Sequence, residues 1–85
     1  MNNEIQITIK LPNKDQVDIS VSPEIRLDQL IDQIQDIYGL AKRPYTVLVT
    51  TKSMVIRENQ TLENLKITTG DILHFTEDLN EQSAD

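Results

Sequence analysis

The spacing of hydrophobic residues changes along this chain from that of strands to that of a helix and back again, and this order is the feature that most constrains its fold. Two runs, 5–11 and 17–21, alternate apolar and polar residues, which places their branched side chains on one face of a strand. Residues 12–15 contain Pro and Asn and separate the runs, so we expect an antiparallel hairpin. From Leu27 the period becomes that of a helix, and from Tyr45 the alternation returns. This order predicts an α+β domain.

The helical segment, 27–38, gathers its apolar residues on one stripe. The stripe consists of Leu27, Leu30, Ile31, Ile34 and Tyr38, and Ile37 widens it. Gly39 stands where helices commonly end in a left-handed residue, and Pro44 prevents the helix from continuing. No Ser, Thr, Asp or Asn immediately precedes Leu27, so the residue that caps the start cannot be assigned from the sequence.

After the helix the sequence predicts a strand at 45–49, a turn and a short strand around 54–56. Val47 and Val49 are expected to point into the core. The pleat of the strand then forces Leu48 onto the opposite face. An outward leucine beside other outward apolar residues is a candidate for an interface, although a single exposed leucine is common.

The segment 61–65 predicts a helical turn with Thr61 as its N-cap, and its leucines are expected to fill the core together with Ile67. The last strand, 72–76, should direct Leu73 and Phe75 inward. The same alternation directs three residues outward: Ile72, His74 and Thr76.

Composition limits the classes of function. A chain of 85 residues forms one domain and has little room for a large active-site cavity. Its net charge of -6 and its scattered Lys and Arg argue against nonspecific nucleic-acid binding. The absence of Cys excludes disulfides and thiol chemistry and fits a reducing compartment. No run is long and apolar enough for a membrane span. We therefore expect a cytoplasmic protein without nucleic-acid partners or membrane insertion.

Candidate catalytic and metal-binding residues are few. His74 is the only histidine, and without Cys it cannot anchor a transition-metal site unless distant carboxylates assist. Asp28, Asp32 and Asp36 recur every four residues and form an acidic row along the predicted helix. Catalysis by paired carboxylates needs a cleft and two different pKa values, so we interpret the row as a solvated face, with docking of a basic partner as the alternative. The sequence predicts no enzyme, cofactor or metal site.

Several blocks of the sequence resemble ubiquitin: Val-Ser-Pro at 21–23, Ile-Gln-Asp at 34–36, Gly39 and Leu-His-Phe at 73–75. The closer resemblance is to the small bacterial YukD-type proteins, also called EsaB, which are encoded with type VII secretion systems. Residues 67–73, Ile-Thr-Thr-Gly-Asp-Ile-Leu, are similar to the closing pattern of that family. The resemblance implies a ubiquitin-like β-grasp fold, with a mixed sheet of four to five strands packed on one α-helix.

The resemblance also implies a function and a site. Such a relative is a non-conjugated adaptor or regulator, a cytoplasmic accessory of the secretion system that binds a protein partner. In ubiquitin the residue that matches Leu48 is the apolar centre of the surface that partners contact, and Ile72, His74 and Thr76 would extend that surface here. Pro12 and Thr76 depart from ubiquitin, which makes the surface smaller and more polar. We expect a protein-interaction site at Leu48, Ile72, His74 and Thr76.

Three segments are expected: a short N-terminal extension at 1–3, the ubiquitin-like domain at 4–77 and a flexible acidic tail at 78–85. The printed sequence ends without the Gly-Gly pair of conjugating and sulfur-carrying relatives. A carrier protein for conjugation or sulfur transfer is therefore a disfavoured alternative. Self-association through a sheet edge or the Leu48 face is a further alternative.

Overall fold

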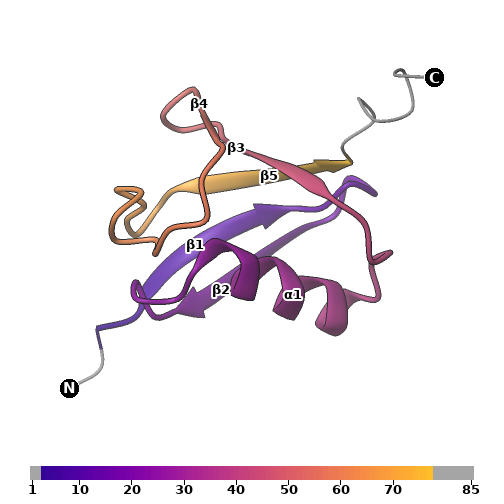
Figure 1. Ribbon diagram of the computed structural model, residues 1–85, viewed down its shortest axis with the longest axis horizontal. Coiled ribbons are helices and arrows are strands. Elements are labelled where there is room, and N and C mark those ends of the chain that lie inside the picture. The colour runs from indigo at the N-terminus through magenta and orange to yellow at the C-terminus, as the bar shows by residue number, and fades with distance from the viewer. Residues whose placement is uncertain (1–2, 78–85) are drawn as a thin grey trace.

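The computed structural model describes residues 3–77, in which one helix packs on one face of a five-stranded sheet (Figure 1). The elements are β1 (Ile5–Lys10), β2 (Gln16–Val21), α1 (Leu27–Tyr38), β3 (Tyr45–Val49), β4 (Met54–Ile56) and β5 (Ile72–Glu77). The strand order is β2-β1-β5-β3-β4, in which β1 and β5 are parallel and the other neighbours are antiparallel. The expected α+β class with a mixed sheet is confirmed. Residues 1–2 of the expected extension and the expected tail, 78–85, lie outside the described residues.

The core lies between α1 and the sheet. Strand alternation sends one set of side chains from β1, β3 and β5 toward the helix, and these are among the most buried in the chain: Ile7, Ile9, Val47, Val49, Leu73 and Phe75. The helix contributes Leu30 and Ile34, which are 0% and 1% exposed. The helix covers this face of the sheet. The alternate residues of the same strands lie on the opposite face, which we call the outer face.

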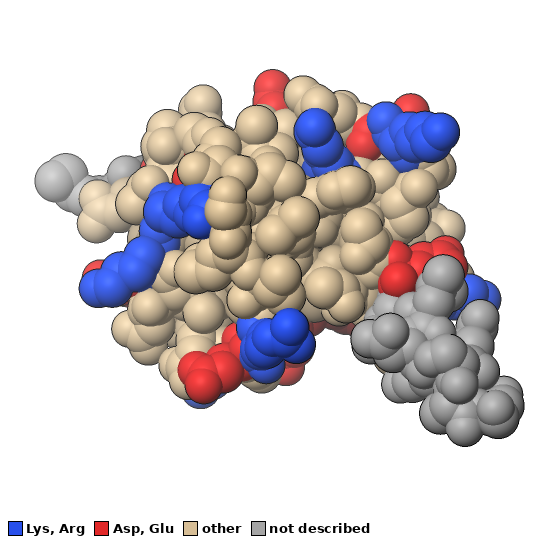
Figure 2. Space-filling model, turned by 90° about the horizontal axis from the view of Figure 1, so that it is seen from above, with Lys and Arg blue, Asp and Glu red and all other residues tan. Residues whose placement is uncertain are grey.

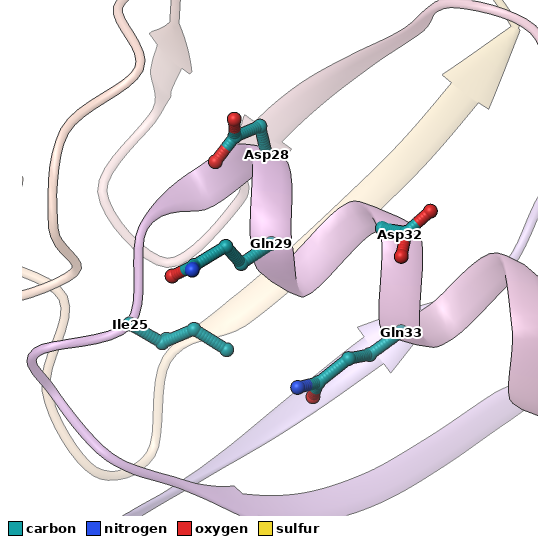
Figure 3. A pocket seen from close by; sticks show the side chains of 5 residues that line it. All are labelled: Ile25, Asp28, Gln29, Asp32 and Gln33. Atoms are coloured by element: carbon teal, nitrogen blue, oxygen red, sulfur yellow. The ribbon is translucent and has the colours of Figure 1, made fainter.

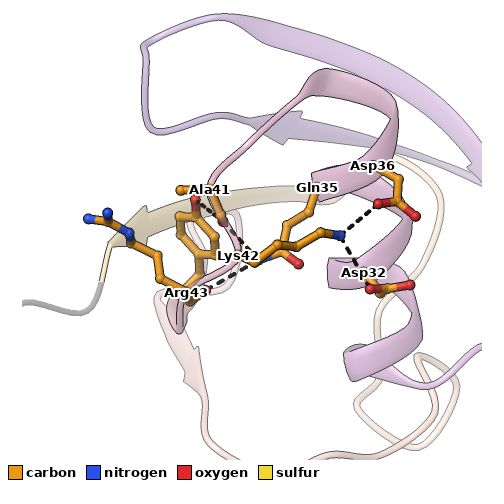
Figure 4. A network of polar contacts seen from close by, with 7 residues as sticks. Asp32, Gln35, Asp36, Ala41, Lys42 and Arg43 are labelled. Carbon is orange, nitrogen blue, oxygen red and sulfur yellow. Dashed lines mark hydrogen bonds and ion pairs between the residues drawn. The ribbon is translucent and has the colours of Figure 1, made fainter.

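The C-terminal part of α1 differs from the predicted stripe. Ile37 is 67% exposed and Tyr38 is 36% exposed, so the prediction that they belong to the buried stripe was wrong. Gln35 is buried instead, and its Nε2 donates hydrogen bonds of 3.2 Å to the carbonyl oxygens of Ala41 and Arg43 (Figure 4). The segment after the helix folds back over this side of α1. Its carbonyl oxygens would lack hydrogen-bond donors there without the amide of Gln35, so a polar side chain is buried at this position.

The start of α1 is capped by a distant loop. The side-chain Oδ1 of Asn59 accepts the backbone N–H of Asp28 at 3.0 Å, and the carbonyl of Gln60 accepts the N–H of Leu27 at 3.0 Å. These are two of the N–H groups that a helix leaves without a partner at its start. The cap was not assignable from the residues before Leu27 because it comes from residues 59–60.

Replacing Asn59 with alanine is expected to lower the free energy of unfolding by about 1 kcal/mol, because the N–H of Asp28 loses its acceptor. Urea denaturation measures the loss. Asn59→Asp is the matched control, since it keeps an oxygen acceptor and places negative charge at the positive end of the helix. Equal stability of Asn59→Ala and the wild type would contradict this role for the loop.

Segment 61–65 forms the expected turn and is hydrogen-bonded to the residues that precede α1, through the carbonyls of Pro23 and Ile25. The N–H of Asn64 donates to Oγ1 of Thr61 at 3.1 Å, which confirms Thr61 as the cap of this turn. Leu62 and Ile67 are 0% and 2% exposed and close one end of the core, while Leu65 is half-buried against it. The turn therefore supplies core residues that no strand or helix provides.

A buried carboxylate joins the turn after β3 to the start of β5. Asp71 is 5% exposed; its Oδ1 accepts a hydrogen bond from Thr51 Oγ1 at 2.7 Å, and its Oδ2 accepts from Lys52 Nζ at 2.5 Å and Thr68 N–H at 2.8 Å. Burial would raise the pKa of Asp71, but the hydrogen bonds from Lys52, Thr68 and Thr51, with the charge of Lys52, hold that pKa below its usual range. We call these four residues the Asp71 network.

Candidate protein-interaction site

The outer face of the sheet carries apolar side chains that the core does not use. In β3, Leu48 lies between two buried valines and is half-buried itself. In β5, Ile72, His74 and Thr76 are likewise half-buried and alternate with core residues. The structure therefore places all four predicted site residues on the outer face, as the alternation requires.

Strand register brings these side chains together. Leu48 lies directly opposite His74 on β5 and opposite Val55 on β4. On its other side, His74 lies opposite Lys10 of β1. Residues directly opposite on the same face of an antiparallel pair have Cβ atoms about 4.5–5.5 Å apart, which is close enough for Leu48 to interact with His74 and with Val55. One row thus crosses four strands, from Lys10 through His74 and Leu48 to Val55.

Val55 is part of this surface, and the prediction from sequence omitted it. It is 39% exposed, which makes it one of the exposed large hydrophobic residues in the described chain. The signal was present, because the inward-facing Ile56, which is 7% exposed, forces its neighbour onto the outer face. We define the outer patch as Leu48, Val55, Ile72, His74 and Thr76.

The margin of the outer patch is polar. Ile72 lies opposite Thr8 of β1, and Oγ1 of Thr76 donates to the carbonyl of Thr46 at 3.3 Å. A shallow hollow lined by Pro12, His74, Thr76 and Glu77 adjoins the patch at one end. Viewed from the side where β3, β4 and β5 lie, most Lys, Arg, Asp and Glu side chains surround a broad uncharged area (Figure 2). An apolar centre with a polar margin is the usual anatomy of a protein interface.

An ion pair between Arg43, in the loop that joins α1 to β3, and Glu77, at the end of β5, lies at one border of this surface. Arg43 Nη1 lies 3.4 Å from Oε1 of Glu77, and the two side chains are 52% and 38% exposed to solvent. A pair of this kind contributes little to stability. It places both signs of charge beside the hollow formed by Pro12 and His74.

The acidic row on α1 lies on another surface and is partly neutralised. Lys42 Nζ donates to Asp36 at 2.6 Å and to Asp32 at 3.5 Å (Figure 4). The hydrogen bond to Asp36 raises the pKa of Lys42, aided by the charges of Asp36 and Asp32. The side chains of Asp28, Asp32 and Asp36 are all exposed, which fits a solvated helix face and leaves the docking of a basic partner as the alternative.

Within residues 3–77, no group of three or more His, Cys, Asp or Glu side chains is arranged to hold a metal ion. Among the described residues, no helix has the length and apolar character needed to cross a membrane.

Comparisons with known proteins identify the fold and the family. A de novo design based on ubiquitin superposes with a TM-score of 0.75 at 18% identity, covering 91% of this chain and 92% of its own. The C-terminal ubiquitin-like domain of human 2'-5'-oligoadenylate synthetase-like protein has a TM-score of 0.74 at 22% identity and covers 92% and 87%. At these identities the likeness shows the fold alone, and it confirms the expected ubiquitin-like β-grasp.

No curated protein matches the chain closely enough to count as a relative. The model of one protein family does match, over residues 5–75, and this family is described as protein YukD of the WXG100 protein secretion system, Wss. The matched range includes every strand and the helix of the described chain, apart from the last residues of β5. The chain therefore belongs to the YukD family of the WXG100 protein secretion system.

Proposed function

We propose that the protein is a non-conjugated ubiquitin-like adaptor or regulator, a cytoplasmic accessory of a bacterial type VII secretion system that acts by binding another protein. The single observation that carries the proposal is the outer patch. Leu48, Val55 and Ile72 come from three different strands and present apolar side chains on one face, although the core has no need of them there. Membership of a secretion-system family supports a partner within that system.

The mechanism proposed is docking without chemistry. Leu48 lies at the centre of the row and is flanked by His74 and Val55, so a partner that covers the patch would bury it most completely. Residues at the centre of an interface contribute most of its binding energy, and the surrounding polar residues mainly exclude water. His74 and Thr76 would supply the hydrogen bonds that fix the orientation of the partner.

Leu48→Asp is expected to weaken this docking about thirtyfold or more, because a central apolar contact worth about 2 kcal/mol is replaced by a carboxylate that must lose its water. The experiment captures partners with the wild type and the variant from cells that make the secretion system, with quantification by mass spectrometry. Secretion-system proteins should be retained by the wild type and lost with Leu48→Asp. Unaltered capture by the variant would remove the outer patch from the proposal.

Ile37→Asp provides a matched control. It also replaces an aliphatic residue with aspartate, but Ile37 is exposed on α1 and does not lie on the outer face. The control should retain the same partners as the wild type. Circular dichroism and the melting temperature should show that both variants fold, because neither residue belongs to the fully buried core.

A further inference from the structure

The two edges of the sheet are protected to different degrees. The edge strand β4 has only three residues, and short edge strands offer little to a pairing chain. The other edge, β2, has six residues and pairs in continuous register with β1, without a bulge. Its sequence, Gln-Val-Asp-Ile-Ser-Val, contains neither Lys nor Pro. β2 therefore lacks most of the devices that usually keep an edge from pairing.

The hairpin shows which N–H and C=O groups of β2 face β1 and which face away from the sheet. The N–H of Leu11 donates to the carbonyl of Asp15 at 2.8 Å, which marks these residues as a hydrogen-bonded pair. Hydrogen-bonded and non-hydrogen-bonded pairs alternate along an antiparallel ladder. Val17 and Ile19 therefore bond to β1, whereas the N–H and C=O groups of Asp18 and Ser20 face away from the sheet. In the part of the chain that the structure describes, β2 pairs with β1 alone.

The seam between β2 and α1 is incompletely filled. Val17 and Ile19 point toward the helix side but remain half-buried, and Ile31 of α1 is also half-buried. At one end of the seam a hollow opens between Val21, Ile25 and Gln33. An added strand could therefore place alternate side chains against apolar groups while its backbone pairs with the edge.

The charges around this seam indicate the charge that a partner bound there should carry. Glu4 and Glu24 line the hollow, and Asp28 and Asp32 line a second hollow that shares Ile25 and Gln33 with the first (Figure 3). No Lys or Arg is among the residues that line either hollow, although Asp32 pairs with Lys42 at 3.5 Å just outside the second. A second copy of this chain has the same net charge of -6, so like net charge opposes the pairing of two copies at this edge, whereas a basic segment is attracted to it.

We propose that β2 is the docking edge for an extended, basic segment of another protein, which adds to the sheet as a sixth strand. The main chain of the segment pairs with Asp18 and Ser20, its alternate apolar side chains enter the seam beside Val17 and Ile19, and its Lys or Arg residues face Glu4 and Glu24. This site is separate from the outer patch, so the protein can hold one chain at its edge and another on its outer face.

The probe is a pool of synthetic octapeptides with Val, Ile or Leu at alternate positions and either basic, acidic or neutral residues between them. Binding is followed by amide exchange and NMR shifts of the whole protein. The amides of Asp18 and Ser20 should exchange freely without peptide and become protected with basic members of the pool, while Val17 and Ile19 are protected throughout. Leu48→Asp should bind these peptides as the wild type does, which separates this test from that of the outer patch.

Ser20→Pro removes one outward N–H and leaves the bonds between β1 and β2 intact, so basic peptides should bind at least about tenfold more weakly. Ser20→Ala keeps that N–H and should bind normally. If proline disturbs the fold, the double variant Glu4→Lys, Glu24→Lys serves instead, and its preference should shift from basic to acidic peptides. Protection elsewhere, preference of the wild type for acidic peptides, or no protection by any member would overturn the proposal. Protection of the same amides by self-association alone would assign the edge to a second copy and would also overturn it.

Discussion

Phe75→Ala is expected to lower the free energy of unfolding by about 3–5 kcal/mol, a large part of what a domain of this size possesses. Phe75 is 0% exposed and lies on β5, the central strand of the sheet. Its ring lies 6.3 Å from that of Tyr45, measured between centroids. Truncation removes contacts with α1 and with neighbouring strands, and the rigid sheet cannot close around the cavity.

Chemical denaturation with urea measures this loss as a shift of the midpoint at an unchanged slope. Phe75→Leu is the graded control, because it refills most of the volume and should cost less than about 1.5 kcal/mol. A loss below about 1 kcal/mol for Phe75→Ala would show that the core tolerates an empty centre, contrary to its packing.

Asp71→Asn is expected to lower the free energy of unfolding by about 2–3 kcal/mol at neutral pH. Both carboxylate oxygens of Asp71 accept hydrogen bonds, from Thr51 on one side and from Lys52 and Thr68 on the other. An asparagine must turn its NH₂ group toward one of these donors, and it gives Lys52 no charge to pair with. Lys52 is 35% exposed, so water recovers part of what is lost at that end.

The pH dependence provides a second readout of the Asp71 network. The pKa of Asp71 is lowered in the folded protein, so its contribution is fully present above the ordinary carboxyl pKa and disappears as the pH falls through the folded pKa. The wild type should therefore lose stability toward acid more steeply than Asp71→Asn, and the two curves should converge at low pH. Lys52→Gln should cost less, because Asp71 keeps Thr51 and Thr68. Parallel curves for the wild type and Asp71→Asn would contradict the assignment.

The local elements of this fold were predictable because each leaves a periodic pattern. Alternation of branched residues identified the strands, the helical stripe identified α1, and Gly39, with φ at 66°, ends the helix as expected. The same alternation fixed which face Leu48 and His74 occupy. The outer patch was therefore foreseen in its main residues, and only Val55 was omitted although its signal was present.

The features that were missed depend on contacts between distant segments. Asn59 caps α1 from another loop, Gln35 is buried because later carbonyls need its amide, and Asp71 is buried because Lys52 and Thr51 reach it. No periodicity records such pairings, since each polar residue alone is typical of a surface. The proposed edge site on β2 is of the same kind, because strand order and not composition leaves one side of β2 without a neighbouring strand in the described chain.

The central position of β5 determines when the domain can fold during its synthesis. Its neighbours β1 and β3 belong to two hairpins that leave the ribosome earlier, and neither hairpin alone buries its apolar face. Until residues 72–77 have emerged, these faces stay exposed and the helix has only part of a sheet to pack on. A chain halted before β5 therefore cannot form a smaller version of the domain, and we expect the newly made protein to fold only after β5 has emerged.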